Sequence, residues 1–216
     1  MKHLLTLCLL AALAMPAMAQ NLKFIGRVNV GFGAQYESLD YSGDQVVYSP
    51  GGGMGLEAGL GYELIKRLDA YATLGFQKNL ALQYESVNGT SNKTSASFGR
   101  GYFTAGLNKL FKTSDGVLNG IILGAGLNYN FPGKLKLTEN SHDMGEWTYT
   151  NALGYQVEAK LRLKFTDTFS MDPGFRYRNI YFEYEPTANS AWPAPANMNR
   201  LNATGVDLSL TLVKRI

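Results

Sequence analysis

The stretch that decides the fold spans residues 153–165 and reads LGYQVEAKLRLKF. Its odd positions are apolar from Leu153 to Phe165, whereas the even positions after Gly154 carry Gln156, Glu158, Lys160, Arg162 and Lys164. Successive side chains of a β-strand point to opposite faces, so this period of two predicts a strand with one apolar and one charged face. The strand is also longer than the roughly 5 or 6 residues usual in soluble proteins.

Seven further segments repeat the alternation, at residues 22–36, 53–64, 70–84, 100–108, 120–131, 169–181 and 205–216. The connections 37–52, 85–95, 132–150 and 183–200 are long, 66–68 and 166–168 are short, and 109–117 is intermediate. Because antiparallel strands place every second connection at the same end, all the long connections lie together. Short periplasmic turns and long extracellular loops are typical of outer-membrane barrels, so the asymmetry predicts that both termini are periplasmic.

A soluble barrel also alternates, with its apolar face inward, so the period alone does not decide which face is inside. Three features favour the membrane. The segments reach or exceed the roughly 9 to 11 residues that cross a bilayer, glycine concentrates on the polar face, and the apolar faces carry few charges. Lys78 and Pro173 are exceptions on the apolar face, and Pro173 predicts irregular pairing because it lacks an N–H. We expect an all-β fold, an eight-stranded antiparallel up-and-down transmembrane β-barrel.

The pattern of the first residues, Met1 to Ala19, predicts a signal peptide. Lys2 is its charged start, an apolar run follows, and Ala17-Met18-Ala19 is a small-x-small cleavage site. We therefore expect the domain to span residues 20–216. Cys8, the single cysteine, leaves with the signal, so the mature domain is expected to hold no disulfide and no thiolate ligand.

Charge and histidine content argue against several functions. The formal charge of +3 falls to 19 − 17 = +2 without Lys2, so nucleic acid is not an expected partner. His142 is the single histidine of the mature domain, between Ser141 and Asp143. Neighbouring residues of an extended segment point in different directions, so this trio predicts neither a catalytic triad nor a metal site. We expect no catalytic residue, no metal and no cofactor.

The polar faces of the strands carry charges of both signs. Six of them are expected to form a charge network in the lumen, namely Arg27, Glu57, Arg100, Glu158, Arg176 and Asp207. Counting from the strand ends places Arg27, Glu57, Glu158 and Arg176 near mid-depth. We expect Arg27 to pair with Glu57, Glu158 with Arg176, and Asp207 with the basic residues of segment 169–181. Such charges either pair and fill the lumen or line a pore that selects ions. An eight-stranded barrel is only just wide enough for its own side chains, which favours filling.

Two long connections contain apolar residues suited to surface contact. Leu135, Leu137, Trp147 and Tyr149 continue the alternation on both sides of a polar turn, which predicts a hairpin that rises above the membrane. An exposed edge of such a hairpin can recruit a partner strand. Trp192 lies in a proline-rich apolar connection, 183–200, that either contacts a partner or covers the barrel mouth.

The chain resembles the small eight-stranded barrels of the opacity-type, or outer-membrane-protein β-barrel, family. The resemblance is carried by the eight segments, by GGGMGLEAGLGY at 51–62, by PGFRYR at 173–178 and by GVDLSLTL at 205–212. It implies a location in the outer membrane of a Gram-negative bacterium, surrounded by membrane lipids, and we expect the barrel to be a monomer. It also implies that the barrel-insertion machinery reads the last strand, which here ends in Ile216 where proteobacterial members commonly have Phe.

The resemblance leaves the function open, because this barrel serves as adhesin, structural protein, narrow channel or lipid-modifying enzyme. Our hypothesis is a non-enzymatic barrel that contributes to envelope integrity or binds an extracellular or envelope partner through its long loops. The alternative is a narrow channel for ions or small solutes. A lipid-modifying enzyme built around His142 is the third hypothesis.

Overall fold

The computed structural model describes residues 21–41, 44–79, 83–85, 93–140, 142–186 and 199–216. The expected signal peptide, Met1–Ala19, and Trp192 lie outside the described residues. Among the described residues, the model contains no helix long and apolar enough to cross a membrane.

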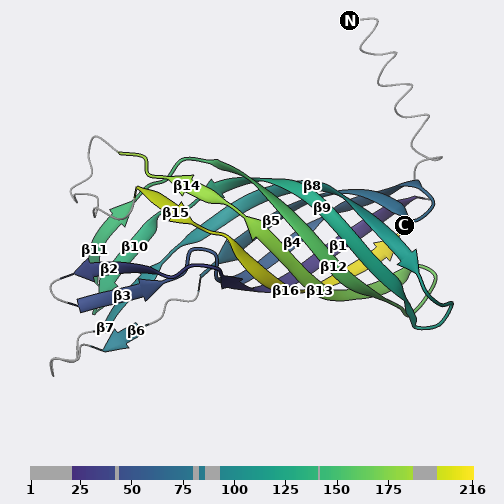
Figure 1. Cartoon of the computed structure of the whole chain (residues 1–216), viewed down its shortest axis with the longest axis horizontal. Helices are drawn as coiled ribbons and strands as arrows, with labels where there is room; N and C mark the ends of the chain where they lie inside the picture. The colour runs from purple at the N-terminus through teal and green to yellow at the C-terminus, as the bar shows by residue number, and fades with distance from the viewer. Residues whose placement is uncertain (1–20, 42–43, 80–82, 86–92, 141, 187–198) are drawn as a thin grey trace, which may run out of the picture.

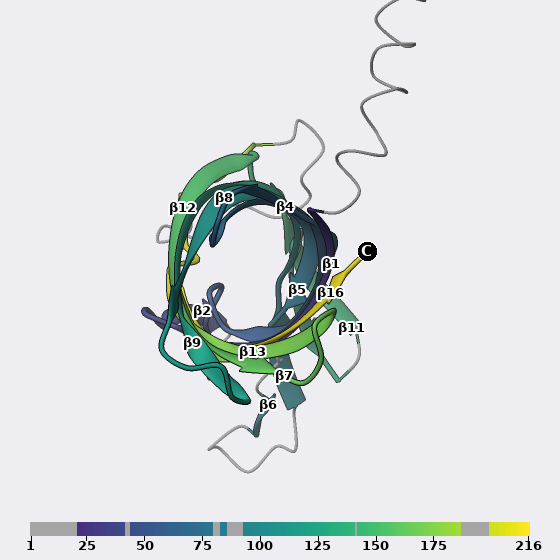
Figure 2. The ribbon, with the colours of Figure 1, turned by 90° about the vertical axis from the view of Figure 1, so that its right-hand side faces the viewer.

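Eight long strands of the described chain form a closed ring (Figures 1 and 2). They are β1 (Leu22–Gly33), β4 (Gly53–Ile65), β5 (Leu68–Lys78), β8 (Gly99–Lys112), β9 (Leu118–Pro132), β12 (Ala152–Lys164), β13 (Phe169–Asn179) and β16 (Gly205–Arg215). Each is antiparallel to its neighbours, and β16 pairs with β1 along its whole length to close the ring. The predicted eight-stranded up-and-down barrel is confirmed.

The outer surface is apolar and the lumen is polar, as the alternation requires. On β12, Leu153 is 69% exposed whereas Gln156, on the opposite face, is 1% exposed. The register aligns apolar side chains around the outside, with Phe76, Leu56, Val28, Leu210 and Pro173 facing one another in turn across β5, β4, β1, β16 and β13. This outward apolar belt is the surface that meets lipid.

The two ends of the barrel differ (Figure 1). At one end, the terminal end, short turns join β4 to β5 and β12 to β13, and both Leu22 and Arg215 lie there. At the other end, the loop end, the connections form further strands. These are β2 (Glu37–Tyr41), β3 (Asp44–Tyr48), β6 (Gln83–Glu85), β7 (Lys93–Ser97), β10 (Leu135–Glu139), β11 (His142–Trp147), β14 (Tyr181–Glu183) and β15 (Arg200–Asn202).

The loop-end strands form three small sheets. Strands β11, β10, β7 and β6 make one sheet in that order, whereas β2 with β3 and β14 with β15 make two hairpin-like pairs. The predicted hairpin over residues 132–150 is therefore present as β10 and β11, with a register shift between Leu137 and Thr138.

Some segment boundaries differ from the sequence-based expectation. The segment predicted over 70–84 ends as a barrel strand at Lys78, because Asn79 then pairs with Phe98. The Asn79 N–H donates to the Phe98 carbonyl at 2.9 Å, and its side-chain Oδ1 accepts from the Phe98 N–H. Gln83–Glu85 belongs to the separate loop-end sheet. The segment predicted over 100–108 is longer than expected and runs as β8 to Lys112.

Candidate functional site

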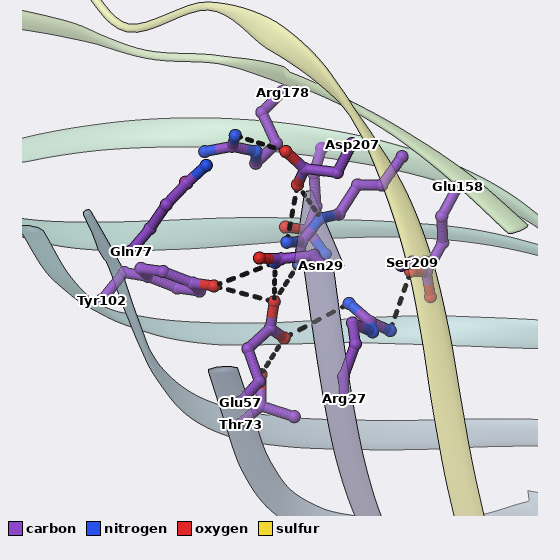
Figure 3. Close-up of polar contacts among 12 residues, drawn as sticks. Arg27, Asn29, Glu57, Thr73, Gln77, Tyr102, Glu158, Arg178, Asp207 and Ser209 are labelled. Atoms are coloured by element: carbon purple, nitrogen blue, oxygen red, sulfur yellow. Dashed lines mark hydrogen bonds and ion pairs between the residues drawn. The ribbon is translucent and has the colours of Figure 1, made fainter. Parts of the chain in front are cut away.

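The middle of the lumen holds a network of buried charges centred on Glu57 (Figure 3). Glu57 on β4 lies opposite Arg27 on β1, whose Nη1 is 3.2 Å from Glu57 Oε2. Arg176 on β13 forms an ion pair with the other oxygen, Oε1, from across the lumen. Tyr102 on β8 donates a hydrogen bond of 2.8 Å to the same oxygen. One carboxylate thus connects β1, β4, β8 and β13.

Two more carboxylates complete the central network. Glu158 Oε2 on β12 lies 2.9 Å from Nη2 of Arg27. Asp207 on β16 accepts hydrogen bonds from Arg176 Nε at 2.8 Å and from Arg178 Nη2 at 2.6 Å. Arg27 and Arg176 therefore each join two carboxylates. Pairing of this kind is the condition under which charges are tolerated away from water.

Ion pairs continue through the lumen toward the terminal end. They are Lys160 with Glu158 at 2.5 Å, Arg162 with Asp172 at 2.7 Å and Lys23 with Asp69 at 2.6 Å. The cavity that remains between these side chains measures about 20 Å³. A single water needs about 10 to 15 Å³ by this kind of measure. This part of the lumen has room for about one water molecule and not for a continuous column.

An ion pair links β12 and β13 where their ladder of paired residues is interrupted at Pro173. Along β12 and β13 the paired residues stop at Lys160 and Gly174 and resume at Leu163 and Met171, so Pro173 lies in an interruption of the ladder. Proline has no N–H to donate to the neighbouring strand. Arg162 bonds both oxygens of Asp172 at 2.8 and 2.7 Å across this interruption. The irregular pairing expected at Pro173 is present, and a buried ion pair links the strands there.

One detail of the expected network is wrong. Glu158 and Arg176 face each other in the register, but no ion pair joins them in the described residues, since each reaches across the lumen to a more distant strand. Arg100, for which no partner was predicted, is buried in the lumen and has no carboxylate partner in the described residues. It donates to Gln77 Oε1 at 2.6 Å, and its guanidinium lies 5.6 Å from the centre of the Tyr102 ring. Strand register predicts neighbours, whereas long side chains in a narrow lumen also reach opposite strands.

Tyrosine side chains pack against glycines in the lumen, and the alternation of the strands does not by itself predict this packing. The hydroxyl of Tyr71 accepts a hydrogen bond of 3.0 Å from Gln156, and a side-chain carbon on Gly106 or Gly126 would lie within 3 Å of it. A side-chain carbon on Gly75 would lie 2.5 Å from the Tyr102 ring. These glycines make room for the large polar residues. Glycines on the polar face of the strands are therefore the sequence signal that could have predicted this packing.

Above the network, the loop end contains a cluster of buried apolar side chains that we call the apolar cap. Its members are Tyr48, Ala96, Phe98, Leu135, Leu137, Trp147, Tyr149, Ala152, Ile180, Phe182, Leu201 and Ala203. The rings of Phe98 and Phe182 pack edge to face at 5.5 Å. The cap draws residues from every loop-end sheet and lies over the lumen charges.

The apolar cap corrects one prediction. Leu135, Leu137, Trp147 and Tyr149 were expected to offer a surface contact, but their exposed fractions are 0%, 1%, 5% and 3%. They pack inward against the cap, because strands that rise into water bury their apolar face against one another. The surface that the loop end offers is therefore polar at these strands.

His142 lies exposed at the tip of the β10–β11 hairpin, opposite Glu139 in the register. Ser141 lies outside the described residues. Where the structure describes the chain, no three histidine, cysteine, aspartate or glutamate side chains gather in a group that could hold a metal ion.

Comparison with known proteins gives one decisive match and several distant ones. The comparison with curated protein sequences found no match. Among solved structures, the chain is similar to Neisserial surface protein A, with 12% identity, 90% of this chain and 97% of that chain covered, and a TM-score of 0.44. It is also similar to Ail, the attachment invasion locus protein of Yersinia pestis, with 10% identity, 90% and 97% covered, and a TM-score of 0.43.

A major outer membrane protein from Thermus thermophilus is similar at 18% identity, with 90% of this chain and 99% of that chain covered and a TM-score of 0.46. The decisive match is the family model described as "Outer membrane protein beta-barrel domain", which matches residues 5–212. It accounts for all eight barrel strands and indicates the outer membrane of a Gram-negative bacterium. The chain belongs to the outer membrane protein beta-barrel domain family.

Proposed function

We propose that this protein is a non-enzymatic, closed barrel that anchors a rigid loop-end platform at the cell surface, where the platform supports envelope integrity or binds a partner. The observation that carries the proposal is the filling of the lumen at two levels. Ion pairs occupy its middle, and the apolar cap covers them. A lumen filled in this way favours a barrel that does not conduct ions.

The charge network supports a closed lumen because its pairs interlock. Glu57 holds Arg27 and Arg176, and these in turn hold Glu158 and Asp207. Opening a path along the axis requires several of these pairs to separate together. Removing one partner of a buried ion pair costs about 3 to 5 kcal/mol, so coordinated opening is strongly disfavoured.

The loop end supports a role as a binding platform. Its connections form strands with their own apolar core in place of irregular loops, so they present fixed surfaces. Strand β11 is the outermost strand of its sheet and pairs with β10 on one side, and a partner chain can add to a strand in such a position. A barrel that is filled inside and structured outside is suited to binding at its surface.

Planar bilayer recording tests the closed-barrel proposal. We expect the full mature chain, reconstituted at low salt and high salt, to give no stable conductance steps. Co-flotation with vesicles and a β-sheet circular dichroism spectrum establish that the silent protein is inserted and folded. Reproducible, ion-selective steps from the wild-type chain would support the narrow channel and overturn the proposal.

Cysteine labelling tests which end faces the outside, because the single cysteine, Cys8, lies in the expected signal peptide. Asp143 is exposed at the loop end, and the side chain of Asp167 is 93% exposed in a short turn at the terminal end. We expect a membrane-impermeant maleimide to label Asp143→Cys but not Asp167→Cys on intact cells. Labelling in the opposite pattern would place the loop end in the periplasm.

A further inference from the structure

The outer wall of the barrel is hollowed at the loop end, where β5, β8 and β9 meet. This hollow, which we call the rim groove, has a volume of about 340 Å³ and is lined by Phe76, Gly101, Phe131, Lys78, Lys134 and Lys136, among others. Its exposed rings, Phe76 and Phe131, lie on the outside of the barrel, and the buried residues Phe98 and Arg100 also contribute to its lining. Its shape and its charge both follow from the strand register.

Two outward-facing glycines of β8 form the floor of the rim groove. Gly101 lies opposite Phe76 on one side and Phe131 on the other, so two exposed rings flank a position with no side chain. One level nearer the loop end, Gly99 lies opposite Lys78, and its carbonyl accepts a hydrogen bond of 2.7 Å from Gly133. The groove therefore has aromatic walls below and a lysine wall above.

The fold itself does not require glycine at position 101. A side-chain carbon built there would have its nearest contacts at 3.9 and 4.0 Å, which is ordinary van der Waals distance. This differs from the lumen glycines, where the same carbon would collide with neighbouring residues. The absence of a side chain at Gly101 keeps the groove open without serving the packing of the barrel.

The upper part of the groove carries an excess of positive charge. Lys78 forms no ion pair in the described part of the chain, whereas Lys134 and Lys136 share one carboxylate, Glu146. The Lys136 Nζ lies 3.0 Å from Glu146 Oε2, and the lysine side chains are about half exposed. Three ammonium groups against one carboxylate leave two positive charges. Hydrogen bonds from Lys134 and Lys136 also hold the pKa of Glu146 below its ordinary value.

We propose that the rim groove binds a phosphorylated lipid of the outer leaflet, with an acyl chain between Phe76 and Phe131 and a phosphate beside Lys78, Lys134 and Lys136. The apolar walls belong to the lipid-facing belt, and the lysines lie where that belt ends, so an amphipathic anion fits both parts at once. Basic clusters at this depth attract anionic headgroups. The proposal rests on the loop end facing the outside of the cell.

Native mass spectrometry of the full mature chain in detergent tests this proposal. The probes are lipid A with both phosphates, the same lipid dephosphorylated, and inorganic phosphate. We expect the wild-type chain to retain the phosphorylated lipid in preference to the dephosphorylated one, and inorganic phosphate not to displace it. Equal retention of the two lipids, or full displacement by inorganic phosphate, would overturn the proposal.

Variants separate the two parts of the groove. In Lys78→Ala/Lys134→Ala, we expect retention of the phosphorylated lipid to fall by about fivefold for each lysine removed. Lys112→Ala/Lys214→Ala at the terminal end removes the same charge and is expected to leave retention unchanged. Gly101→Leu fills the floor and is expected to reduce retention of both lipids. Unchanged retention in the first variant and in Gly101→Leu would exclude the rim groove as the site.

Lipid retention and conductance are independent readouts. A conducting barrel that still prefers phosphorylated lipid through Lys78 and Lys134 would overturn the closed-lumen proposal and leave the rim groove in place. A barrel that does not conduct and shows no preference for phosphorylated lipid would overturn the rim-groove proposal and leave the closed-lumen proposal in place. Labelling of Asp167→Cys in place of Asp143→Cys on intact cells would remove the outer leaflet as the source of the lipid.

Discussion

The lumen and the apolar cap are both buried, but they are made of opposite kinds of residue. Inside the barrel wall most of the inward side chains are charged or polar, as with Arg100 and Arg178. Immediately above, the inward side chains on the same strand pairs are apolar, as with Phe98, Ile180 and Phe182. The direction of the side chains persists while their chemistry reverses.

The reversal follows from what lies outside the wall. Where the barrel is surrounded by lipid, apolar side chains face outward at little cost, and the polar ones must turn inward and pair. Where the strands rise into water, the hydrophobic effect drives the apolar side chains inward as in a soluble protein. The change between Phe98 and Arg100, and between Arg178 and Ile180, marks the level at which the lipid ends. The rim groove lies at this same level.

The largest loss of stability is expected when the central carboxylate of the lumen network is removed. Glu57→Ala leaves Arg27 and Arg176 each with one carboxylate fewer in a buried site. We expect a loss of about 3 to 5 kcal/mol in the free energy of unfolding, measured by urea titration of the barrel in detergent micelles. Glu57→Gln keeps the size and the hydrogen bond from Tyr102, so it should lose less. A midpoint equal to wild type in Glu57→Ala would show that water already enters the network.

Opening the apolar cap should have a smaller and more local effect. Phe182 is fully buried and packs on Phe98, so Phe182→Ala is expected to destabilise the cap by about 3 kcal/mol. The barrel below should keep its unfolding midpoint because its ion pairs are untouched. Fluorescence of Trp147 in a Trp192→Phe background reports the cap alone, since the chain has two tryptophans. Loss of the barrel and the cap in one transition would show that the two regions are a single cooperative unit.

The sequence predicts the barrel because one physical rule governs all eight strands. Alternation such as that of Leu153 to Phe165 is readable without a structure, and the lengths of the connections indicate how the strands are joined. The cap is not readable in the same way. Leu135 and Leu137 alternate as clearly as Leu161 and Leu163, but the period does not say whether water or lipid lies outside. The prediction of a surface contact at Leu135 and Leu137 is wrong for this reason.

The lumen network is predictable only at the level of neighbouring strands. Arg27 and Glu57 face each other because consecutive strands of known length fix the register, and their contact at 3.2 Å follows. The contact of Arg176 with Glu57 crosses the ring, so it depends on the barrel's width and on side-chain reach. The strand pattern contains neither the barrel's width nor the reach of the side chains. Arg100 illustrates the same limit, since it faces the lumen as expected and contacts Gln77 in place of a carboxylate.

The smallest effects are expected from a Leu→Val substitution, made once in the apolar cap and once on the outer belt. Leu135 is completely buried in the apolar cap, whereas Leu161 is 46% exposed on the outer belt. Shortening a buried aliphatic side chain by one methylene costs about 0.5 to 1.5 kcal/mol because a small cavity remains. On the belt, mobile acyl chains fill the space, so Leu161→Val should change the free energy of unfolding by less than about 0.5 kcal/mol. Trp147 fluorescence measures the loss in Leu135→Val, and the unfolding of the barrel measures the loss in Leu161→Val. Equal losses would mean that lipid packs on the belt as rigidly as protein packs in the cap.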